Sequence, residues 1–479
     1  MEEATVKLSV PVGEEVIHLS ALDQQAQRHY AKPMLFFKFN HEGINDPIIG
    51  HLRKGLSVAL SETPDFASTI APVPGSTRKE LQLGLNPESG ASWRVVDHTA
   101  EVNKDAWVYG TFDELAAKHF SLTDIPLKRL VNPAFVNISE DLRELPSFGI
   151  QLNLIEGGVI LVASWHHTVS DARGFNVLLS SWARRTKESI LRGEPDEPII
   201  PAEETRGRWR LDYGMTNATI AQVPEYAIDA NARSPRSATS LHLLDREDPL
   251  GAPFQVSTWY ISAAHVQALR DRLGAAADSG GFTAVEAISA LFWKHVSRAR
   301  RLLDNNEGGT SLFTTRLEFR ARLIPPLSGD YIGNICEPNA HARVPLSELC
   351  SPATRASLAT LASAIRAATE AVDDGAVRTY IGLINTLPAV TDLTWKYDGF
   401  PGPDFGVTDL SGLDVRRTDW GPGLGSPVCL RLAYREGGLL YLFPGDAQGG
   451  LEVQALCEPD ALERLKVDEE MVKYATFRG

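Results

Sequence analysis

Two neighbouring histidines and an aspartate form the segment of this sequence that is best suited to chemistry. His166 and His167 are adjacent, and Asp171 follows four positions after the second histidine. An unperturbed imidazole has a pKa of about 6.5, so a positioned neutral ring can accept a proton near pH 7. An aspartate across a turn can orient that ring or hold the loop together. The alternative interpretation is a pair of structural histidines at the end of a strand.

The elements around this segment follow from its apolar pattern. Residues 150–155 alternate apolar and polar side chains, Gly157 and Gly158 follow, and residues 159–163 are almost wholly apolar. This pattern predicts a β-hairpin whose second strand is buried on both faces. After Gly174, apolar residues recur at helical spacing, which predicts an amphipathic helix. The histidines therefore lie at a strand–loop–helix junction, where a rigid frame exposes their side chains.

Length and composition predict two domains or a single unit with two cores. The chain has 479 residues, a formal charge of −14, 43% hydrophobic residues and 23% charged residues, as packed globular proteins do. A single core stops growing at about 250–300 residues. The proline-interrupted residues 194–236 predict a crossover between an N-terminal domain, residues 1–193, and a C-terminal domain, residues 237–479.

The acidic balance disfavours a nucleic-acid binder, whereas an anionic small ligand needs only local positive charge.

The second half combines strands and helices. A strand is predicted over residues 254–261, and Thr283 and Glu286 have the spacing of a capping box at the start of a helix. Ser351-Pro352 predicts a further helix with proline at its first position. Three apolar runs near the end of the chain predict an antiparallel meander, over residues 428–434, 439–443 and 451–456.

Several other chemistries are disfavoured. The four cysteines lack zinc-site spacing, and four thiols in a chain of this length do not make a disulfide scaffold. Neither a G-x-S-x-G elbow nor a dinucleotide-binding loop is recognisable. The first residues do not resemble a signal peptide, and no apolar run reaches the roughly 18 residues of a membrane span. We therefore expect a cytoplasmic protein with no metal, no tightly bound cofactor and no membrane partner.

Two motifs that lie far apart in the chain resemble those of the BAHD acyltransferases. His167-Thr-Val-Ser-Asp171 matches the HxxxD motif, and Asp419-Trp-Gly-Pro-Gly-Leu-Gly425 is similar to the D-F-G-P-G-L-G variant of the fungal members. Shorter strings match in the same order, at residues 21–23, 317–323, 329–334 and 451–453. The resemblance spans nearly the whole chain and indicates the fungal branch that is similar to trichothecene 3-O-acetyltransferases.

The resemblance implies both a fold and an activity. The fold is α/β (α+β), with two chloramphenicol-acetyltransferase-like domains, mixed sheets flanked by helices, and a channel between the domains. The activity is transfer of an acyl group, most commonly acetyl, from acyl-CoA to a hydroxyl or amine of a small secondary metabolite. His167 acts as general base, and the acceptor attacks the thioester directly without an acyl-enzyme. Such an enzyme works as a monomer on its two substrates, without nucleic acid.

The resemblance also implies roles for individual residues. Asp171 supports the loop by pairing with Arg320, and Thr408 donates a hydrogen bond to the oxyanion; a surface-loop threonine is the alternative for Thr408. CoA binding is implied for a group on the first helix of the second half and for the second motif: Thr283, Arg298, Arg300, Arg301, Asp419, Trp420, Gly421 and Gly423. For Thr283 the alternative role is a plain helix N-cap. For the three arginines the alternative is a place at the C-terminus of a helix, where the helix dipole favours positive charge.

Three positions depart from the family pattern. Ala172 stands where the family commonly has Gly, Trp420 replaces Phe, and Ser426 replaces a basic residue, which weakens a phosphate-binding role for the second motif. A stand-alone condensation-type domain, which takes acyl groups from a carrier protein, fits the first motif about as well. A non-catalytic scaffold is disfavoured because His167 is retained. At a charge of −14, CoA binding requires that positive charge be concentrated locally.

Overall fold

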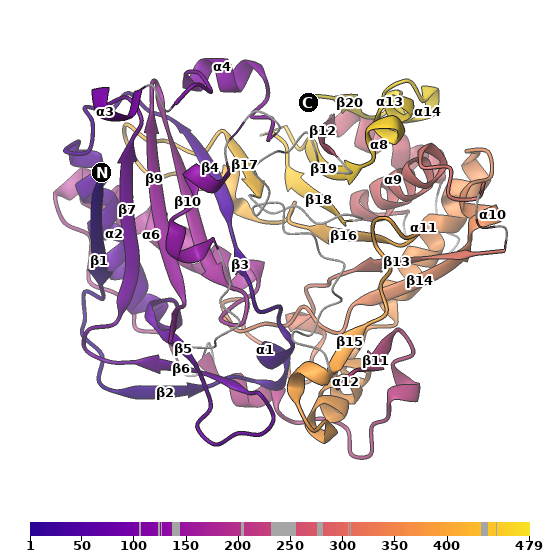
Figure 1. Cartoon of the computed structure of the whole chain (residues 1–479), viewed down its shortest axis with the longest axis horizontal. Helices are drawn as coiled ribbons and strands as arrows, with labels where there is room; N and C mark the ends of the chain where they lie inside the picture. The colour runs from indigo at the N-terminus through magenta and orange to yellow at the C-terminus, as the bar shows by residue number, and fades with distance from the viewer. Residues whose placement is uncertain are drawn as a thin grey trace.

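Two seven-stranded mixed sheets frame the protein (Figure 1). The computed structural model describes residues 1–104, 107–122, 125, 127–136, 144–202, 206–230, 255–274, 281–304, 306, 308–432, 439–446 and 448–479. Helices flank both sheets, so the expected α/β fold with mixed sheets is confirmed.

The first sheet belongs mainly to the N-terminal half. Its strand order is β1 (Glu2–Lys7), β7 (Gly90–Asp97), β9 (Phe148–Ile155), β10 (Gly158–His166), β4 (Pro33–Lys38) and β17 (Cys429–Leu432), with β3 (Tyr30–Ala31) beside β10. The predicted hairpin is confirmed, because β9 and β10 pair antiparallel with Ile155 opposite Gly158. The turn is Glu156-Gly157, where φ is +79° at Gly157, and Gly158 is already in the strand.

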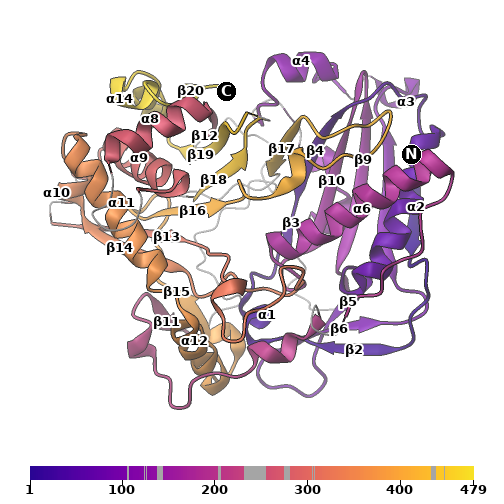
Figure 2. The ribbon, with the colours of Figure 1, turned by 180° about the vertical axis from the view of Figure 1, so that it is seen from behind.

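Both faces of the first sheet are buried. Leu161 of β10 packs into a core shared with α2 (Pro47–Glu62) and α6 (Ala172–Arg192), which lie across the sheet in Figure 2. Ile160 faces the opposite side, where it joins a second cluster with Phe36 and Phe120. The almost wholly apolar composition of β10 follows from this double burial.

The second sheet belongs to the C-terminal half. Its order is β14 (Ala340–Pro345), β13 (Thr310–Thr315), β16 (Phe405–Asp409), β18 (Leu439–Pro444), β19 (Leu451–Cys457), β12 (Gln255–Ile261) and β20 (Thr476–Phe477). One face packs against helices, namely α8 (Ala263–Leu273), α9 (Ala284–Ala299), α11 (Arg355–Glu370) and α13 (Pro459–Lys466). The other face contributes Leu439, Tyr441 and Phe443 to the same core as α6, so one core joins the two halves.

Smaller elements complete the frame. A four-stranded sheet contains β2 (Glu15–His18), β6 (Leu81–Leu85), β5 (Thr69–Pro72) and β8 (Leu145–Pro146), and a two-stranded sheet contains β11 (Tyr226–Ile228) and β15 (Leu393–Trp395). The remaining helices include α1 (Ala21–Gln25), α4 (Phe112–Ala117), α10 (Leu346–Leu349), α12 (Asp374–Thr386) and α14 (Glu469–Val472). Within the described residues, no helix combines the length and apolar character that crossing a bilayer requires.

Two predictions about the second half need correction. The run at residues 428–434 is not a strand of the C-terminal meander, because β17 pairs with β4 of the first sheet; residues 433 and 434 lie outside the described part. Of the three runs predicted to form the meander, the second and third form β18 and β19, which pair antiparallel as predicted. Helix α11 begins at Arg355 with Thr354 as its cap, so Pro352 precedes the helix and does not occupy its first position.

The crossover at residues 194–236 is described over residues 194–202 and 206–230. Its described residues contain a 3-10 helix, η3 (Arg208–Leu211), whose Arg208 side chain is only 2% exposed. Residues 203–205 and 231–236 lie outside the described part, as does residue 254, where we expected the next strand to begin. The predicted boundaries at 193 and 237 stay predictions.

Candidate active site

A cavity of about 260 Å³ lies between the two halves and contains His167. Its wall comes from both halves, because His29, Trp165 and Asp171 precede the crossover and Arg316 and Thr408 follow it. Apolar side chains form much of the wall, including Trp165, Leu317, Leu410, Leu413, Leu432 and Tyr441. The structure thus brings together four residues that the sequence placed in one site, namely His167, Asp171, Arg320 and Thr408.

His167 is held at the end of β10 from two directions. Its backbone N–H donates to the carbonyl of His29 at 2.8 Å, and its Nδ1 lies 3.2 Å from Oδ1 of Asn334. Nδ2 of Asn334 donates to Oδ1 of Asp23 at 3.0 Å and to the carbonyl of His167 at 2.8 Å. If the amide of Asn334 were flipped, its oxygen would face these two acceptor oxygens and neither hydrogen bond could form. Oδ1 therefore faces the imidazole and can only accept, so Nδ1 carries the proton and Nε2 is left as the base.

The environment keeps the imidazole neutral. Desolvation by the surrounding protein is the largest cause that lowers the pKa of His167, and the positive charge of Arg316 lowers it further, to about 4. Hydrogen bonding and Asp171 act in the opposite direction without offsetting these effects. At pH 7 the ring is therefore neutral, and Nε2 can accept a proton.

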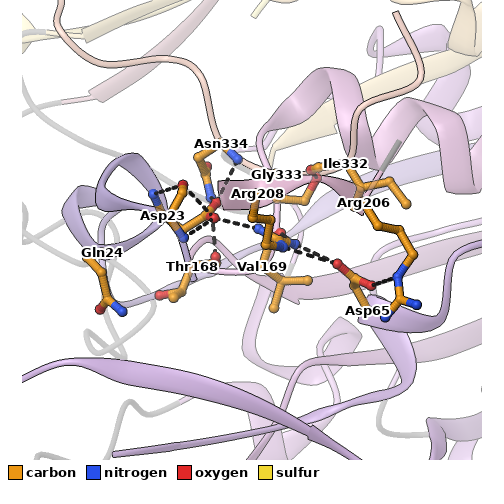
Figure 3. A network of polar contacts seen from close by, with 12 residues as sticks. Asp23, Gln24, Asp65, Thr168, Val169, Arg206, Arg208, Ile332, Gly333 and Asn334 are labelled. Atoms are coloured by element: carbon orange, nitrogen blue, oxygen red, sulfur yellow. Dashed lines mark hydrogen bonds and ion pairs between the residues drawn. The ribbon is translucent and has the colours of Figure 1, made fainter. Parts of the chain in front are cut away.

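A buried polar network around Asp23 and Arg208 holds Asn334 (Figure 3). Oδ1 of Asp23 accepts hydrogen bonds from the backbone N–H of Asn334 at 2.7 Å and from its side chain. Arg208 of η3 forms an ion pair with Asp23 at 2.7 Å and a second with Asp65 at 2.8 Å. Asp23 and Asp65 are fully buried, so the guanidinium of Arg208 supplies the charge that two desolvated carboxylates require. The crossover therefore takes part in positioning Asn334.

Asp171 holds the loop and not the imidazole. Both of its carboxylate oxygens accept from Nη2 of Arg320 at 3.0 Å. One oxygen also caps α6 through the N–H of Gly174, and the other accepts from the N–H of Ile335. A side chain on Gly174 would collide with the carbonyl of Ile332, which explains why glycine is needed here, whereas Ala172 has a partly exposed side chain. The carboxylate thus joins the loop after β10 to the second half.

The other polar residues of the cavity differ in their roles. Thr408 lies on β16 at the wall of the cavity, with its hydroxyl 3.4 Å from Nη1 of Arg316. Cys336 also lines the cavity, and burial raises the pKa of its thiol to about 12, so it is not a thiolate nucleophile at pH 7. His166 is buried against Tyr30, accepts from the N–H of Thr168, and does not line the cavity.

The predicted CoA-binding residues in and around α9 lie outside this cavity; α8 precedes α9, so α9 is not the first helix of the second half as the sequence predicted. Thr283 caps α9 in a complete capping box with Glu286. The guanidinium of Arg300 donates to both carboxylate oxygens of Glu458 and to the carbonyls of Pro401 and Gly402. Arg298 lies 3.9 Å from Asp468, and Arg301 is exposed. These contacts match the structural alternatives, and a role in CoA binding stays a prediction.

The second motif fastens the C-terminal half to α6. Asp419 pairs with Lys187 of α6 at 2.8 Å and accepts from the N–H of Gly421. Trp420 is fully buried and packs edge-on against Trp182 and Phe37. Positive φ values at Gly421 and Gly423, of +99° and +90°, form the turn. None of these four motif residues lines the cavity around His167.

Sequence reasoning did not single out several cavity residues. Asn334 is the last residue of the segment 329–334 that resembles the family, but nothing in that segment predicts its contact with His167. Arg316 and Lys32 add positive charge to the cavity wall, and Gln27 and His29 line it as well. An isolated asparagine or arginine next to a strand has no local signal that separates it from an ordinary surface residue. Within the described residues, no group of three or more His, Cys, Asp or Glu side chains is arranged for a metal ion.

The fold and the site define a two-domain acyltransferase architecture, and comparison with known proteins agrees. The profile of the Transferase family matches residues 1–472. The chain is 52% identical over 480 residues to the acyltransferase easC of Emericella nidulans, covering 100% of this chain and 98% of that protein. It is 47% identical over 485 residues to the acyltransferase cm3D of Cordyceps militaris, covering both in full.

Solved structures show the same fold. TRI101 of F. graminearum, complexed with coenzyme A and T-2 mycotoxin, superposes with a TM-score of 0.76 at 19% identity, covering 97% of this chain and 100% of that one. Vinorine synthase superposes with a TM-score of 0.66 at 17% identity, covering 99% and 97%. The chain belongs to the Transferase family, the BAHD acyltransferases. It is an acyltransferase enzyme.

Proposed function

We propose that this enzyme transfers an acyl group, with acetyl as the first candidate, from acyl-CoA to a hydroxyl or amine of a small secondary metabolite. The observation that carries the proposal is the protonation and the position of the His167 imidazole. It is a neutral imidazole whose Nε2 is left unprotonated by Asn334, and it opens onto a cavity built by both halves. The coenzyme A in the TRI101 complex supports CoA as the acyl carrier in this fold.

His167 acts as general base in the first step. Nε2 removes the proton from the acceptor as its oxygen or nitrogen attacks the thioester carbonyl. The hydrogen bond from Nδ1 to Asn334 remains when the ring becomes positively charged, so the imidazolium keeps its orientation. General base catalysis of this kind contributes about 10²–10⁴-fold to the rate.

Thr408 is placed to assist the tetrahedral intermediate. Attack on the thioester converts its carbonyl oxygen into an oxyanion, which needs a preorganised donor. The hydroxyl of Thr408 is on the wall of the same cavity as His167, on a strand and not on a mobile loop. One donor of this kind is typically worth about 10²–10³-fold in kcat.

Collapse of the intermediate completes the transfer. The bond between the carbonyl carbon and sulfur breaks, and CoA leaves as a thiolate that takes the proton from the imidazolium. His167 returns to its neutral form, and the acylated acceptor and CoA are the two products. No residue is acylated, which agrees with the protonated state of Cys336, the cysteine among the cavity residues.

The anionic end of CoA requires positive charge outside the reacting centre. Among the described residues, Arg301 at the end of α9 forms no ion pair, whereas Arg300 pairs with Glu458 and Arg298 lies 3.9 Å from Asp468. Ser426 in the second motif supplies no charge. We therefore favour the end of α9 over the second motif for the phosphates.

The test is release of free CoA thiol from acetyl-CoA with a panel of small alcohols and amines, read with a thiol reagent. The proposal expects acceptor-dependent release together with an acylated product of matching mass. The same panel offered an acetyl group on a carrier protein tests the condensation-type alternative. Transfer from the carrier protein without transfer from acetyl-CoA would contradict the proposal.

A further inference from the structure

Arg316 places a positive charge inside the reaction cavity. It follows the last residue of β13, and its half-buried side chain lines the same cavity as His167. Within the described part of the chain, its guanidinium has one hydrogen bond, a long one of 3.4 Å from Nη1 to the hydroxyl of Thr408. Among the described residues, no carboxylate forms an ion pair with it.

The carboxylates that line this cavity are engaged elsewhere. Asp171 pairs with Arg320 through both of its oxygens, and Glu318 pairs with Arg320 at 3.1 Å. The carboxylate of Asp409 accepts from the backbone N–H and the hydroxyl of Ser411. Arg320 is thus neutralised within the protein, whereas Arg316 is not.

The surroundings of Arg316 favour a ligand that complements its charge. Leu317, Leu410 and Leu413 lie on the wall of the cavity, and apolar walls strengthen electrostatic interactions inside it. Lys32, which donates to the carbonyl of Tyr30, is a further cation on the wall. A charged group held in an apolar site is stabilised when a counter-charge binds beside it. The planar guanidinium suits a carboxylate in particular, since it can donate two parallel hydrogen bonds.

We propose that Arg316 binds a carboxylate carried by one of the two substrates, and that this enzyme therefore acts on a carboxylate-bearing substrate. The inference rests on the proposed function, because it assigns the cavity to the acceptor and the acyl group. Both can reach this wall, so the carboxylate belongs either to the acceptor or to the acyl chain of the thioester. The positive charge of Arg316 also helps to keep His167 neutral, which supports its closeness to the reacting centre.

The test measures equilibrium binding by isothermal titration calorimetry, which does not require turnover. The acceptor arm compares octanoate with octanamide, and the donor arm compares malonyl-CoA with acetyl-CoA. Each pair is titrated into the parent enzyme, Arg316→Met and Arg316→Lys. Arg173→Met is the matched control, because Arg173 also lines the cavity but is exposed. Circular dichroism establishes that each variant is folded.

We expect the parent to prefer the carboxylate ligand of one arm by about tenfold or more. Arg316→Met should abolish that preference, Arg316→Lys should keep part of it because an ammonium lacks the planar fork, and Arg173→Met should keep it. Absence of a preference in both arms of the parent would overturn the inference. Arg316→Met would also overturn the inference if it lowered the affinity for charged and neutral ligands equally. Arg316 would then stabilise the oxyanion or the folded protein and would not bind a carboxylate.

Failure of the proposed function gives a different result. If acetyl-CoA never releases CoA with any acceptor, the reaction is wrong, yet a carboxylate preference that depends on Arg316 still supports the binding site. Conversely, acceptor-dependent CoA release with no carboxylate preference in either arm supports the reaction and rejects the site.

Discussion

Nδ1 of His167 donates a hydrogen bond to Oδ1 of Asn334 at 3.2 Å, across the boundary between the two halves of the chain. His167 follows β10 of the first sheet, whereas Asn334 lies in the segment between η7 (Arg320–Arg322) and β14 of the second half. The amide of Asn334 is in turn oriented by Asp23, which Arg208 of the crossover holds. The tautomer of the base therefore depends on both halves and on the segment that joins them.

Asn334→Ala should lower kcat by at least about tenfold, because the imidazole loses the contact that fixes its tautomer and orientation. KM for acyl-CoA should change little, since Asn334 is behind the base. Steady-state kinetics of CoA release measure both quantities. Asn176→Ala is the control, because Asn176 is also a buried asparagine but lies on α6. An Asn334→Ala enzyme with unchanged kcat would show that the tautomer is set elsewhere.

Asp171→Asn should act through the fold of the loop. It removes the charge that pairs with Arg320, and breaking a buried pair by deleting one partner costs about 3–5 kcal/mol. We expect a large fall in the free energy of unfolding, measured by urea denaturation, and a loss of activity that follows it. Asp113→Asn, in the exposed pair with Lys38, should have little effect. A stable Asp171→Asn protein with an unmoved loop and no activity would argue for a direct catalytic role.

Cys336→Ser should retain most of the activity. The thiol lines the cavity, but its raised pKa keeps it protonated, and the direct mechanism forms no bond to it. Mass spectrometry of the enzyme after incubation with acetyl-CoA should show no acetyl group on Cys336. A covalent adduct that forms and decays at the rate of turnover would replace direct attack with an acyl-enzyme mechanism.

The activity should persist well below neutral pH. The pKa of His167 in the folded protein is lowered from 6.5 to about 4, so the base stays unprotonated at pH 5 and is lost as the pH falls through about 4. We expect kcat/KM to be level from pH 7 to 5 over the range in which circular dichroism shows a folded protein. Arg316→Met removes a cation and should raise the pKa of His167, which shifts this acid limb to higher pH. A shift to lower pH, or none, would place Arg316 away from the base.

Local patterns predicted the framework of the site well. The alternation in residues 150–155 and the apolar run that follows predict β9 and β10. The apolar spacing after Gly174 predicts α6, which begins two residues earlier, at Ala172, with Asp171 as its cap, so the position of His167 follows from neighbouring residues. The capping box at Thr283 is equally local, and α9 begins there.

Pairing and charge partners over long distances were not predictable in this way. The apolar residues of β17 indicate a strand, but nothing in them specifies β4, nearly 400 positions earlier, as the neighbour. Asn334 and Arg316 owe their importance to what the fold places opposite them. The requirement for local positive charge at the CoA site, which followed from the net charge of −14, stays a prediction; Arg316 and Lys32 add positive charge to the wall of the cavity.

The most direct test of the account is kcat for CoA release by His167→Ala, measured with acetyl-CoA and the best acceptor of the panel. If His167 is the general base, kcat should fall by about 10²–10⁴-fold while the variant keeps the thermal stability of the parent and its affinity for acetyl-CoA. A folded His167→Ala enzyme that turns over at the rate of the parent would contradict the central claim.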